Sequence, residues 1–357
     1  MPRLRRLLLL VPLWFAVPVR GDEPLSYPPA DQVRKAFLKL LDRPKVSPRP
    51  VVAPAEKTAS GARLERCSFI SEKKADGAFE RVPVLILYPE VVKGKAPAVI
   101  VLHGTGGTAK SQLGYMEELC KRGIIGVAID ARYHGERAGG AKGAAAYHKA
   151  ILAAWRTKAG EPMEHPFFYD TVWDLWRLVD FLETVPEIDA KRLGMIGFSM
   201  GGIETWMAAS ADERIRASVP AIGVQSFRWS LERDLWQGRA RTIQPVHDAA
   251  AKDLGEEKSN AKVCRQVWDK ILPGITEQFD CPSLLRLCAG RPLLILGGTK
   301  DGNCPYGGAK VAIESARRAY AEAKASDKLQ VIVEDVGHTV TAKQRAASLA
   351  FFEKWLK

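Results

Sequence analysis

One serine in this sequence lies between glycines, at a point where a strand is expected to turn sharply into a helix. Residues 197–201 read Gly-Phe-Ser-Met-Gly; an apolar segment typical of a buried strand precedes them, and an apolar helix-forming segment follows. The glycines allow a tight turn that would hold the hydroxyl of Ser199 clear of the backbone. At a helix N-terminus, backbone N–H groups can also stabilise an anion. Because glycine-rich turns with a serine are common, the partners of Ser199 must decide its role.

A serine nucleophile needs a histidine base, itself oriented by a carboxylate. His338 follows an apolar strand-like segment at 329–334 and precedes a helix expected from residue 342. The other histidine that follows Ser199, His247, lies in a charged, helical-looking segment with no such strand. We therefore predict that His338 is the general base.

The carboxylate is expected on the loop after the preceding strand. Residues 291–298 are apolar after Arg291 and end in two glycines, and Asp301 follows them. The carboxyl ends of neighbouring parallel strands meet at one edge of a sheet, so Asp301 and His338 should face each other. An Asp-Gly pair also forms turns, which does not exclude this role. Glu334 and Asp335 are rival acids. Both lie too close to His338 in sequence to reach its Nδ1 from the usual direction, and Asp301 is therefore the predicted acid.

Two backbone N–H groups are predicted to stabilise a tetrahedral oxyanion, each lowering the barrier by about 3–4 kcal/mol. One belongs to Met200, the residue after the nucleophile. The other belongs to Thr105, with Gly106 as the alternative, in the segment His-Gly-Thr-Gly-Gly at 103–107 that follows an expected strand. His103 is expected to fix this loop rather than to act as the base.

Together these residues make the chain similar to α/β-hydrolases of the dienelactone hydrolase, acetyl xylan esterase and prolyl oligopeptidase group. The resemblance is carried by segments at 103–107, 130–135, 169–174, 188–194, 197–201, 291–294, 301–305 and 337–338. It implies serine-hydrolase chemistry with no metal or organic cofactor. The Asp-x-x-Cys-Pro form of the acid loop is similar to that of acetyl xylan and cephalosporin deacetylases. The chain departs from dienelactone hydrolases proper in having serine rather than cysteine as the nucleophile, and from the oligopeptidases in having no N-terminal propeller before its expected core strands.

Alternating strand-like and helix-like segments predict the α/β-hydrolase fold, with a mostly parallel eight-stranded sheet and helices on both faces. The strands are expected at 63–70, 82–88, 98–102, 124–129, 193–196, 217–220, 293–296 and 331–334, the first two as an antiparallel pair. Residues 60–357 form the predicted catalytic domain. Before it, residues 22–59 combine an amphipathic helix at 31–41, expected to pack on the domain, with a proline-rich linker at 44–54.

Two long segments between strands, 138–166 and 225–287, are expected to form a partial lid over the site. The second follows the sixth strand and is helical, charged and rich in tryptophan. We predict that Trp229 and Trp236 bind substrate; alternatively, they anchor the inserted helices to the core, as Trp268 would. Three further polar residues could look catalytic but are expected to brace the loop below the site: Asp130, Arg132 and His134.

Residues 1–21 are predicted to be a secretory signal peptide, because three arginines precede a 13-residue apolar run that is too short to span a membrane. Its removal, with four arginines and no acid, lowers the formal net charge from +12 to +8. The remaining basic residues are spread along the chain without a nucleic-acid-binding motif, so no nucleic-acid partner is expected, although acidic glycans would suit the charge. An apolar fraction of 46% predicts a packed core.

Export permits disulfides among the six cysteines. Cys264, Cys281 and Cys288 cluster in one insertion, and a bridge among them is expected. Cys67 and Cys120 are expected as buried free thiols. No Cys/His spacing is typical of a metal site.

The predicted function is hydrolysis of a carboxylic ester by a secreted or periplasmic serine esterase. The resemblance and the expected export favour a short-acyl carbohydrate ester, such as an acetylated glycan. A serine peptidase of the prolyl oligopeptidase type is the first alternative, and a catalytically silent binding protein is the second. The presence of Ser199, Asp301 and His338 together argues against the second.

Overall fold

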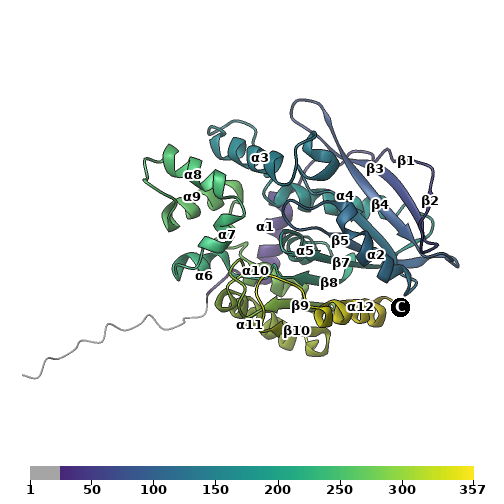
Figure 1. The fold of residues 1–357 in the computed structure, drawn as a ribbon. Helices are drawn as coiled ribbons and strands as arrows, with labels where there is room; N and C mark the ends of the chain where they lie inside the picture. The colour runs from purple at the N-terminus through teal and green to yellow at the C-terminus, as the bar shows by residue number, and fades with distance from the viewer. Residues whose placement is uncertain (1–24) are drawn as a thin grey trace, which may run out of the picture.

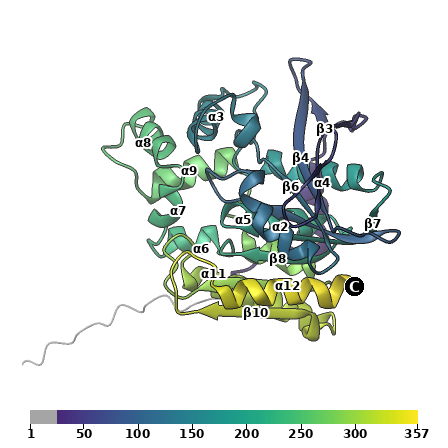
Figure 2. The ribbon, with the colours of Figure 1, turned by 45° about the vertical axis from the view of Figure 1, so that its right-hand side comes forward.

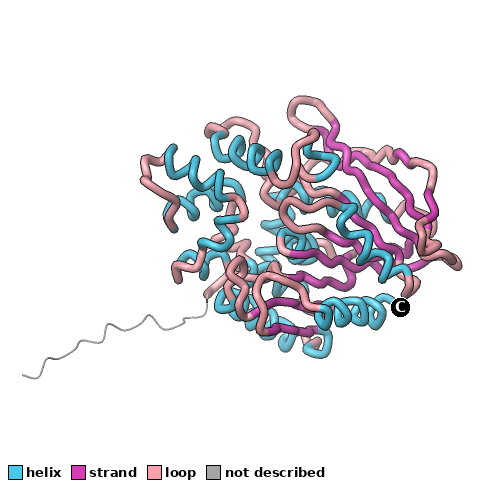
Figure 3. Tube along the Cα trace, in the orientation of Figure 1, coloured by secondary structure: helices cyan, strands magenta, loops and turns pink. Residues whose placement is uncertain are grey.

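A computed structural model describes residues 25–357, and the predicted signal peptide lies outside them. A ten-stranded sheet crosses the molecule in the order β1-β3-β4-β6-β5-β7-β8-β9-β10, with β2 paired to β3 (Figures 1 and 3). The strands are β1 Val51–Val52, β2 Glu56–Lys57, β3 Arg63–Lys73, β4 Phe79–Tyr88, β5 Ala96–Leu102, β6 Ile125–Ile129, β7 Ile188–Phe198, β8 Ile215–Ala221, β9 Leu293–Gly298 and β10 Leu329–Glu334. From β6 to β10 all neighbours are parallel, whereas β3, β4 and β6 pair antiparallel. The mostly parallel α/β fold is confirmed.

The prediction of eight strands was two too few. Strands β1 and β2 lie in or just after the proline-rich segment at 44–54, and each pairs with the edge strand β3 over two residues only. Proline lacks the N–H that a ladder needs, which limits such pairing to short stretches at the edge of a sheet.

Helices cover both faces of the sheet. Alternate residues of β5 enter different cores: Ile100 joins one hydrophobic cluster and Val101 the other. Helices α2 Leu113–Cys120 and α12 Ala342–Leu356 pack on the face of Val101. The opposite core contains residues of α1 Ala30–Leu40, α4 Tyr169–Leu182, α5 Met200–Ala211 and α11 Tyr306–Glu322. Short 3-10 turns complete the structure at η1 Ala109–Gln112, η2 Gly135–Ala138, η3 Arg286–Cys288 and η4 Ser326–Lys328.

The predicted N-terminal helix is α1, and it packs on the domain as expected. Phe37 is fully buried, and its ring makes edge contacts with Tyr169 and Trp176 of α4 at centroid distances of 5.7 and 6.1 Å. Arg34 donates hydrogen bonds to the backbone of Leu287 at 2.8 Å and to Glu213 at 2.6 Å. None of the helices in the described part of the chain has the length and apolar character needed to cross a membrane.

The two long segments between strands are helical. The first contains α3 Ala145–Arg156; the second contains α6 Phe227–Glu232, α7 Gln237–Arg241, α8 Gln244–Asp253, α9 Ala261–Ile271 and α10 Cys281–Leu285. Helix α3 packs against α8 and α9, and together they form a lobe beside the sheet (Figures 1 and 2). Trp268 is fully buried, with its ring 5.3 Å from that of Phe227, so it anchors this lobe.

The expected disulfide among Cys264, Cys281 and Cys288 is not formed. All six cysteines are free and buried. The three residues belong to the same hydrophobic core but to different elements, α9, α10 and η3, and burial raises the pKa of Cys264 to about 12. Cys67 and Cys120 are buried free thiols, as predicted.

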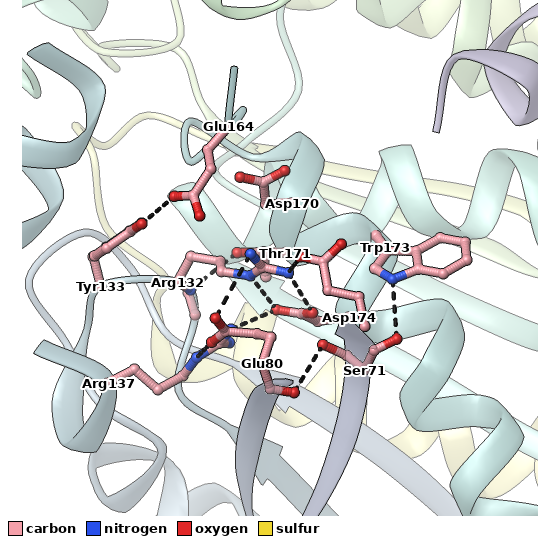
Figure 4. Close-up of polar contacts among 12 residues, drawn as sticks. Ser71, Glu80, Arg132, Tyr133, Arg137, Glu164, Asp170, Thr171, Trp173 and Asp174 are labelled. Carbon is pink, nitrogen blue, oxygen red and sulfur yellow. Dashed lines mark hydrogen bonds and ion pairs between the residues drawn. The ribbon is translucent and has the colours of Figure 1, made fainter. Parts of the chain in front are cut away.

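A cluster of buried charges ties the antiparallel edge of the sheet to α4 (Figure 4). Arg132 donates two hydrogen bonds to Asp174, at 2.8 and 2.9 Å, and one to Glu72 at 2.5 Å. Arg137 contacts Asp174 at 2.8 Å and Glu80 at 2.6 Å. Although burial acts to raise the pKa of Asp174, the charges of Arg132 and Arg137 outweigh it and hold that pKa well below its usual range. These five residues, the buried charge cluster, give Arg132 the bracing role predicted for it.

Candidate active site

The serine at the end of β7 sits on a strained turn. Ser199 has φ of 56°, a left-handed value that is uncommon for residues other than glycine, and it is the N-cap of α5. A Cβ at Gly197 would lie 2.0 Å from the backbone oxygen of Gly201, and a Cβ at Gly201 would lie 2.7 Å from the backbone oxygen of Leu102. Glycine is therefore required on both sides of the serine, which explains the motif.

His338 reaches this serine from the loop after β10. Its Nε2 lies 2.8 Å from Oγ of Ser199, and its Nδ1 lies 2.8 Å from Oδ2 of Asp301. With Nδ1–H donating to the carboxylate, Nε2 is free to accept the hydroxyl proton of the serine. The side chain of His338 is 23% exposed, whereas that of Asp301 is 1% exposed. The structure thus brings together the three residues that the sequence singled out.

Asp301 is held by its own loop. Its Oδ1 accepts hydrogen bonds from the backbone N–H groups of Asn303 at 2.8 Å and Cys304 at 2.9 Å, which leaves Oδ2 for the histidine. The two rival carboxylates bond elsewhere. Glu334 accepts from Thr341 at 2.6 Å, and Asp335 accepts from Thr299 and Lys300, both at 2.7 Å.

The loop after β5 adjoins the serine, since a Cβ at Gly104 would lie 3.5 Å from Cβ of Ser199. The carbonyl of Gly104 accepts from Nδ1 of His103 at 2.8 Å and from the N–H of Gly107 at 2.9 Å. In a planar trans peptide the C=O and N–H point in opposite directions. The N–H of Thr105, which shares that peptide, is therefore turned away from His103.

His103 fixes this loop in one tautomer. Because Nδ1 donates to Gly104, Nε2 accepts from the backbone N–H of Ala131 at 3.1 Å. Burial lowers the pKa of His103, which keeps the ring neutral and both bonds intact. On the other side, the N–H of Gly201 donates to the carbonyl of His103 at 3.1 Å. Met200, the first residue of α5, has no acceptor for its N–H within the helix. Met200 directly follows Ser199, and Thr105 directly follows Gly104, which adjoins the serine; their role as oxyanion donors stays a prediction.

The two predicted substrate-binding tryptophans have different settings. The ring of Trp229 packs on α11, where a Cβ at Gly307 would lie 2.2 Å from it. Trp236 is half-buried and donates from Nε1 to Asp234 at 2.7 Å. These contacts join the indoles to α11 and to the insertion itself; their role in binding substrate stays a prediction.

Among the described residues, one group has ligand atoms close enough to share a cation: Asp301, Cys304 and His338, all within 4.8 Å of one another. The carboxylate and the imidazole are already bonded to each other, and burial raises the pKa of Cys304 to about 12. A neutral thiol beside a bonded pair fits a catalytic triad better than a metal site.

Sequence reasoning missed three residues of the insertion that contact the loop of Asp301: Gln225, Gly238 and Arg239. Gln225 donates to the backbone oxygen of Asn303, and Arg239 donates to Cys304. The one available signal was a glycine inside a helix-forming segment, which often marks a close backbone approach.

The fold and this arrangement of loops are similar to those of α/β-hydrolases. Residues 82–253, nearly half of the chain, match the model of the dienelactone hydrolase family. Over this part the chain is similar to dienelactone hydrolases, and its fold is that of the α/β-hydrolases.

Curated relatives and solved structures agree with this placement. YtaP of Bacillus subtilis (strain 168), provisionally named a hydrolase, is 27% identical over 78% of this chain and 84% of its own length. YitV of the same strain, provisionally named an esterase, is 26% identical over 77% of this chain and 96% of its own length. Acetyl xylan esterase 1 from Thermoanaerobacterium sp. JW/SL YS485 superposes with a TM-score of 0.65 at 20% identity, covering 92% of this chain and 94% of that one. Glucuronoyl esterase from Solibacter usitatus gives a TM-score of 0.60 at 18% identity, covering 90% and 92%.

Proposed function

We propose that this protein is an exported serine esterase that cleaves a short-acyl, acetyl-type carbohydrate ester through an acyl-enzyme. The observation that carries the proposal is the hydrogen-bonded path from Ser199 through His338 to Asp301, with 2.8 Å at each of its two steps. This geometry meets the requirement for an activated serine, in which the base touches the nucleophile and a third group orients the base.

In the proposed mechanism, Oγ of Ser199 attacks the ester carbonyl while Nε2 of His338 takes the hydroxyl proton. The N–H groups of Met200 and Thr105 stabilise the tetrahedral oxyanion, and Asp301 stabilises the imidazolium. His338 then protonates the leaving alkoxide, which departs as an alcohol and leaves an acyl group on the serine. Water repeats the cycle: His338 takes its proton, the acyl group departs as a carboxylic acid, and Ser199 is restored.

The relatives support an ester of a carbohydrate as substrate. YitV is provisionally named an esterase, and the structural neighbours named above are an acetyl xylan and a glucuronoyl esterase. The predicted signal peptide at 1–21 supports a secreted or periplasmic location, where glycans are accessible. Trp229 and Trp236 belong to the insertion beside the acid loop, and we assign them to the wall that limits the acyl group.

The test is a matched substrate series on the protein without residues 1–21. We expect acetylated xylo-oligosaccharides and nitrophenyl acetate to be hydrolysed, and a peptide anilide to be left intact. One excess methylene in a narrow pocket costs about 1–3 kcal/mol, so kcat/KM should fall steeply from acetyl to octanoyl. A kcat/KM that rises with acyl length would contradict the short-acyl assignment, and preferential cleavage of the peptide would favour the peptidase alternative.

A further inference from the structure

The insertion between β8 and β9 touches the acid loop at successive residues. The acid loop is defined here as residues 301–308, from Asp301 to the first turn of α11. Helix α7 contacts its beginning, and the backbone N–H of Ser226 donates to the carbonyl of Gly308 at its end, at 3.2 Å. The insertion is therefore joined to the loop that carries the acid of the proposed triad.

The closest approach is between two glycines. A Cβ at Gly238 would lie 1.8 Å from the backbone oxygen of Gly302 and 2.5 Å from its carbonyl carbon. Both are backbone atoms, so no side-chain rotation could relieve the overlap. Gly238 is in α7, where glycine is unfavourable by about 1 kcal/mol relative to alanine. Glycine is nevertheless required at position 238, because α7 packs directly against the backbone of Gly302.

A buried arginine completes the contact. Arg239 is 1% exposed, and its Nη2 donates to Sγ of Cys304 at 3.0 Å. With the side-chain amide of Gln225 oriented so that both of its polar atoms are paired, its oxygen accepts from Nε of Arg239 at 2.9 Å and its nitrogen donates to the backbone oxygen of Asn303 at 2.9 Å. The thiol of Cys304 in turn donates to the backbone oxygen of Ile222, at the end of β8, at 3.3 Å.

These contacts fall on the residues that orient the triad acid. The backbone N–H groups of Asn303 and Cys304 both donate to Oδ1 of Asp301. The insertion therefore touches the carbonyl of Gly302 and both residues whose N–H groups hold the carboxylate. A shift of this loop would rotate the carboxylate away from His338, and displacements of about 1 Å at a catalytic group can cost 10²-fold in rate.

We infer that Gly238 and Arg239 are positioning residues, which act through the acid loop to hold Asp301 against His338. The inference rests on the proposed serine-esterase function. It makes the insertion part of the catalytic frame, in addition to any role as a wall for substrate. Gly238 sets the distance between α7 and the loop, and Arg239 with Gln225 sets the orientation of the two peptide groups.

The test is the Gly238→Ala variant, with Gly114→Ala as the matched control. Gly114 lies in α2, and a Cβ there would have no atom within 4 Å. We expect Gly238→Ala to lower kcat on nitrophenyl acetate about ten- to hundredfold, with KM changed less than about threefold. Gly114→Ala should keep wild-type kcat. Far-UV circular dichroism and thermal unfolding establish the folded fraction, and burst titration with a fluorophosphonate counts the active sites.

Three further variants test the inference if Gly238→Ala does not fold. Arg239→Met should lower kcat in the same way, Arg239→Lys should retain more activity than Arg239→Met, and Arg241→Met, at the exposed arginine of the same helix, should be silent. A double-mutant cycle with Asp301→Asn distinguishes a positioning role from a merely structural one. In the Asp301→Asn background, Gly238→Ala or Arg239→Met should change the rate at which the fluorophosphonate labels Ser199 by less than about twofold.

Additive losses in that cycle would overturn the inference, as would wild-type kcat in Gly238→Ala and Arg239→Met. A wild-type protein that neither hydrolyses esters nor reacts with the fluorophosphonate would instead overturn the proposed function, so the two failures are distinguishable.

Discussion

Two regions of this molecule, the buried charge cluster and the triad, concentrate hydrogen-bonded titratable side chains, and they differ in what lies at the end of the hydrogen-bonded path. In the buried charge cluster, every guanidinium meets carboxylates; Arg132 and Arg137 share Asp174, whose side chain is fully buried. In the triad, the path from Asp301 through His338 ends on the hydroxyl of Ser199, and the histidine is partly exposed. Density of polar groups is common to both, so it does not distinguish a catalytic site from a brace.

The backbone differs between the two regions as well. Ser199 has a positive φ and lies between glycines whose positions tolerate no Cβ. This strained backbone presents the hydroxyl of the serine for reaction. The charge cluster instead joins β3, β4, the loop after β6 and α4 through ion pairs between side chains. Changes in the triad should therefore remove activity and spare stability, whereas changes in the cluster should do the reverse.

The largest effect is expected at the nucleophile. Ser199→Ala should lower kcat on the order of 10⁴–10⁶-fold, leaving the rate supported by the oxyanion hole and binding. The thermal unfolding midpoint should stay within a few degrees of wild type, because one partly exposed hydroxyl is removed. Steady-state kinetics and differential scanning calorimetry check both statements; retention of more than about a tenth of kcat would rule out Ser199 as the nucleophile.

The second-largest loss of kcat is expected at Asp301, the acid of the proposed triad. Asp301→Asn should lower kcat on the order of 10³–10⁴-fold, because an amide cannot hold the required imidazole tautomer. The control is Asp335→Asn, whose carboxylate contacts Thr299 and Lys300 on the surface and should leave kcat unchanged. The reverse result, a large loss at Asp335 and none at Asp301, would reassign the acid.

Substitutions in the charge cluster should lower the stability of the fold rather than the activity. Asp174→Asn removes the fully buried carboxylate that Arg132 and Arg137 share, which leaves each guanidinium with one hydrogen-bonded carboxylate partner, and should lower the free energy of unfolding by about 3 kcal/mol at pH 7. The pKa of Asp174 is depressed in the folded protein, so its contribution is present at neutral pH and is lost as pH falls below about 4. Urea unfolding at pH 7 and pH 3 should show the gap between wild type and variant narrowing. An equal gap at both pH values would contradict the assigned charge.

The smallest effect is expected at His134, beside the cluster. Burial lowers the pKa of this imidazole from 6.5 to about 4, and its Nδ1 donates to the backbone oxygen of Arg132 at 2.9 Å. Because the folded pKa is depressed, the stabilisation is present above pH 6.5 and is lost as pH falls toward 4. Relative to His134→Phe, the wild type should lose about 1–2 kcal/mol between pH 7 and pH 4.5. A pH-independent difference would show that His134 is not buried in its neutral form.

The triad could be predicted from the sequence because its members follow apolar strands in a fixed order along the chain. Local pattern places Asp301 and His338 on the loops after β9 and β10, and parallel strands bring those loops together. The eight longer strands were predictable from their apolar pattern, which alternates in β3 and β4 and forms short apolar runs in the parallel strands.

Long-range pairings were not predictable in this way. Nothing in the local sequence shows that Glu72 and Asp174 meet at Arg132, or that Gly238 lies against Gly302. The same limit explains the wrong disulfide, because closeness in sequence says little about whether two thiols face each other. The short strands β1 and β2 were not predicted, because prolines interrupt the run of strand-forming residues in this segment.

The most direct test of the account is covalent trapping of the nucleophile. The protein without residues 1–21 is treated with a fluorophosphonate, digested and mapped by mass spectrometry. We expect one adduct per molecule, on Ser199, together with complete loss of esterase activity and no adduct in Ser199→Ala. An adduct on another residue that accompanies the loss of activity, or full esterase activity with no adduct at all, would contradict the claim that Ser199 is the nucleophile.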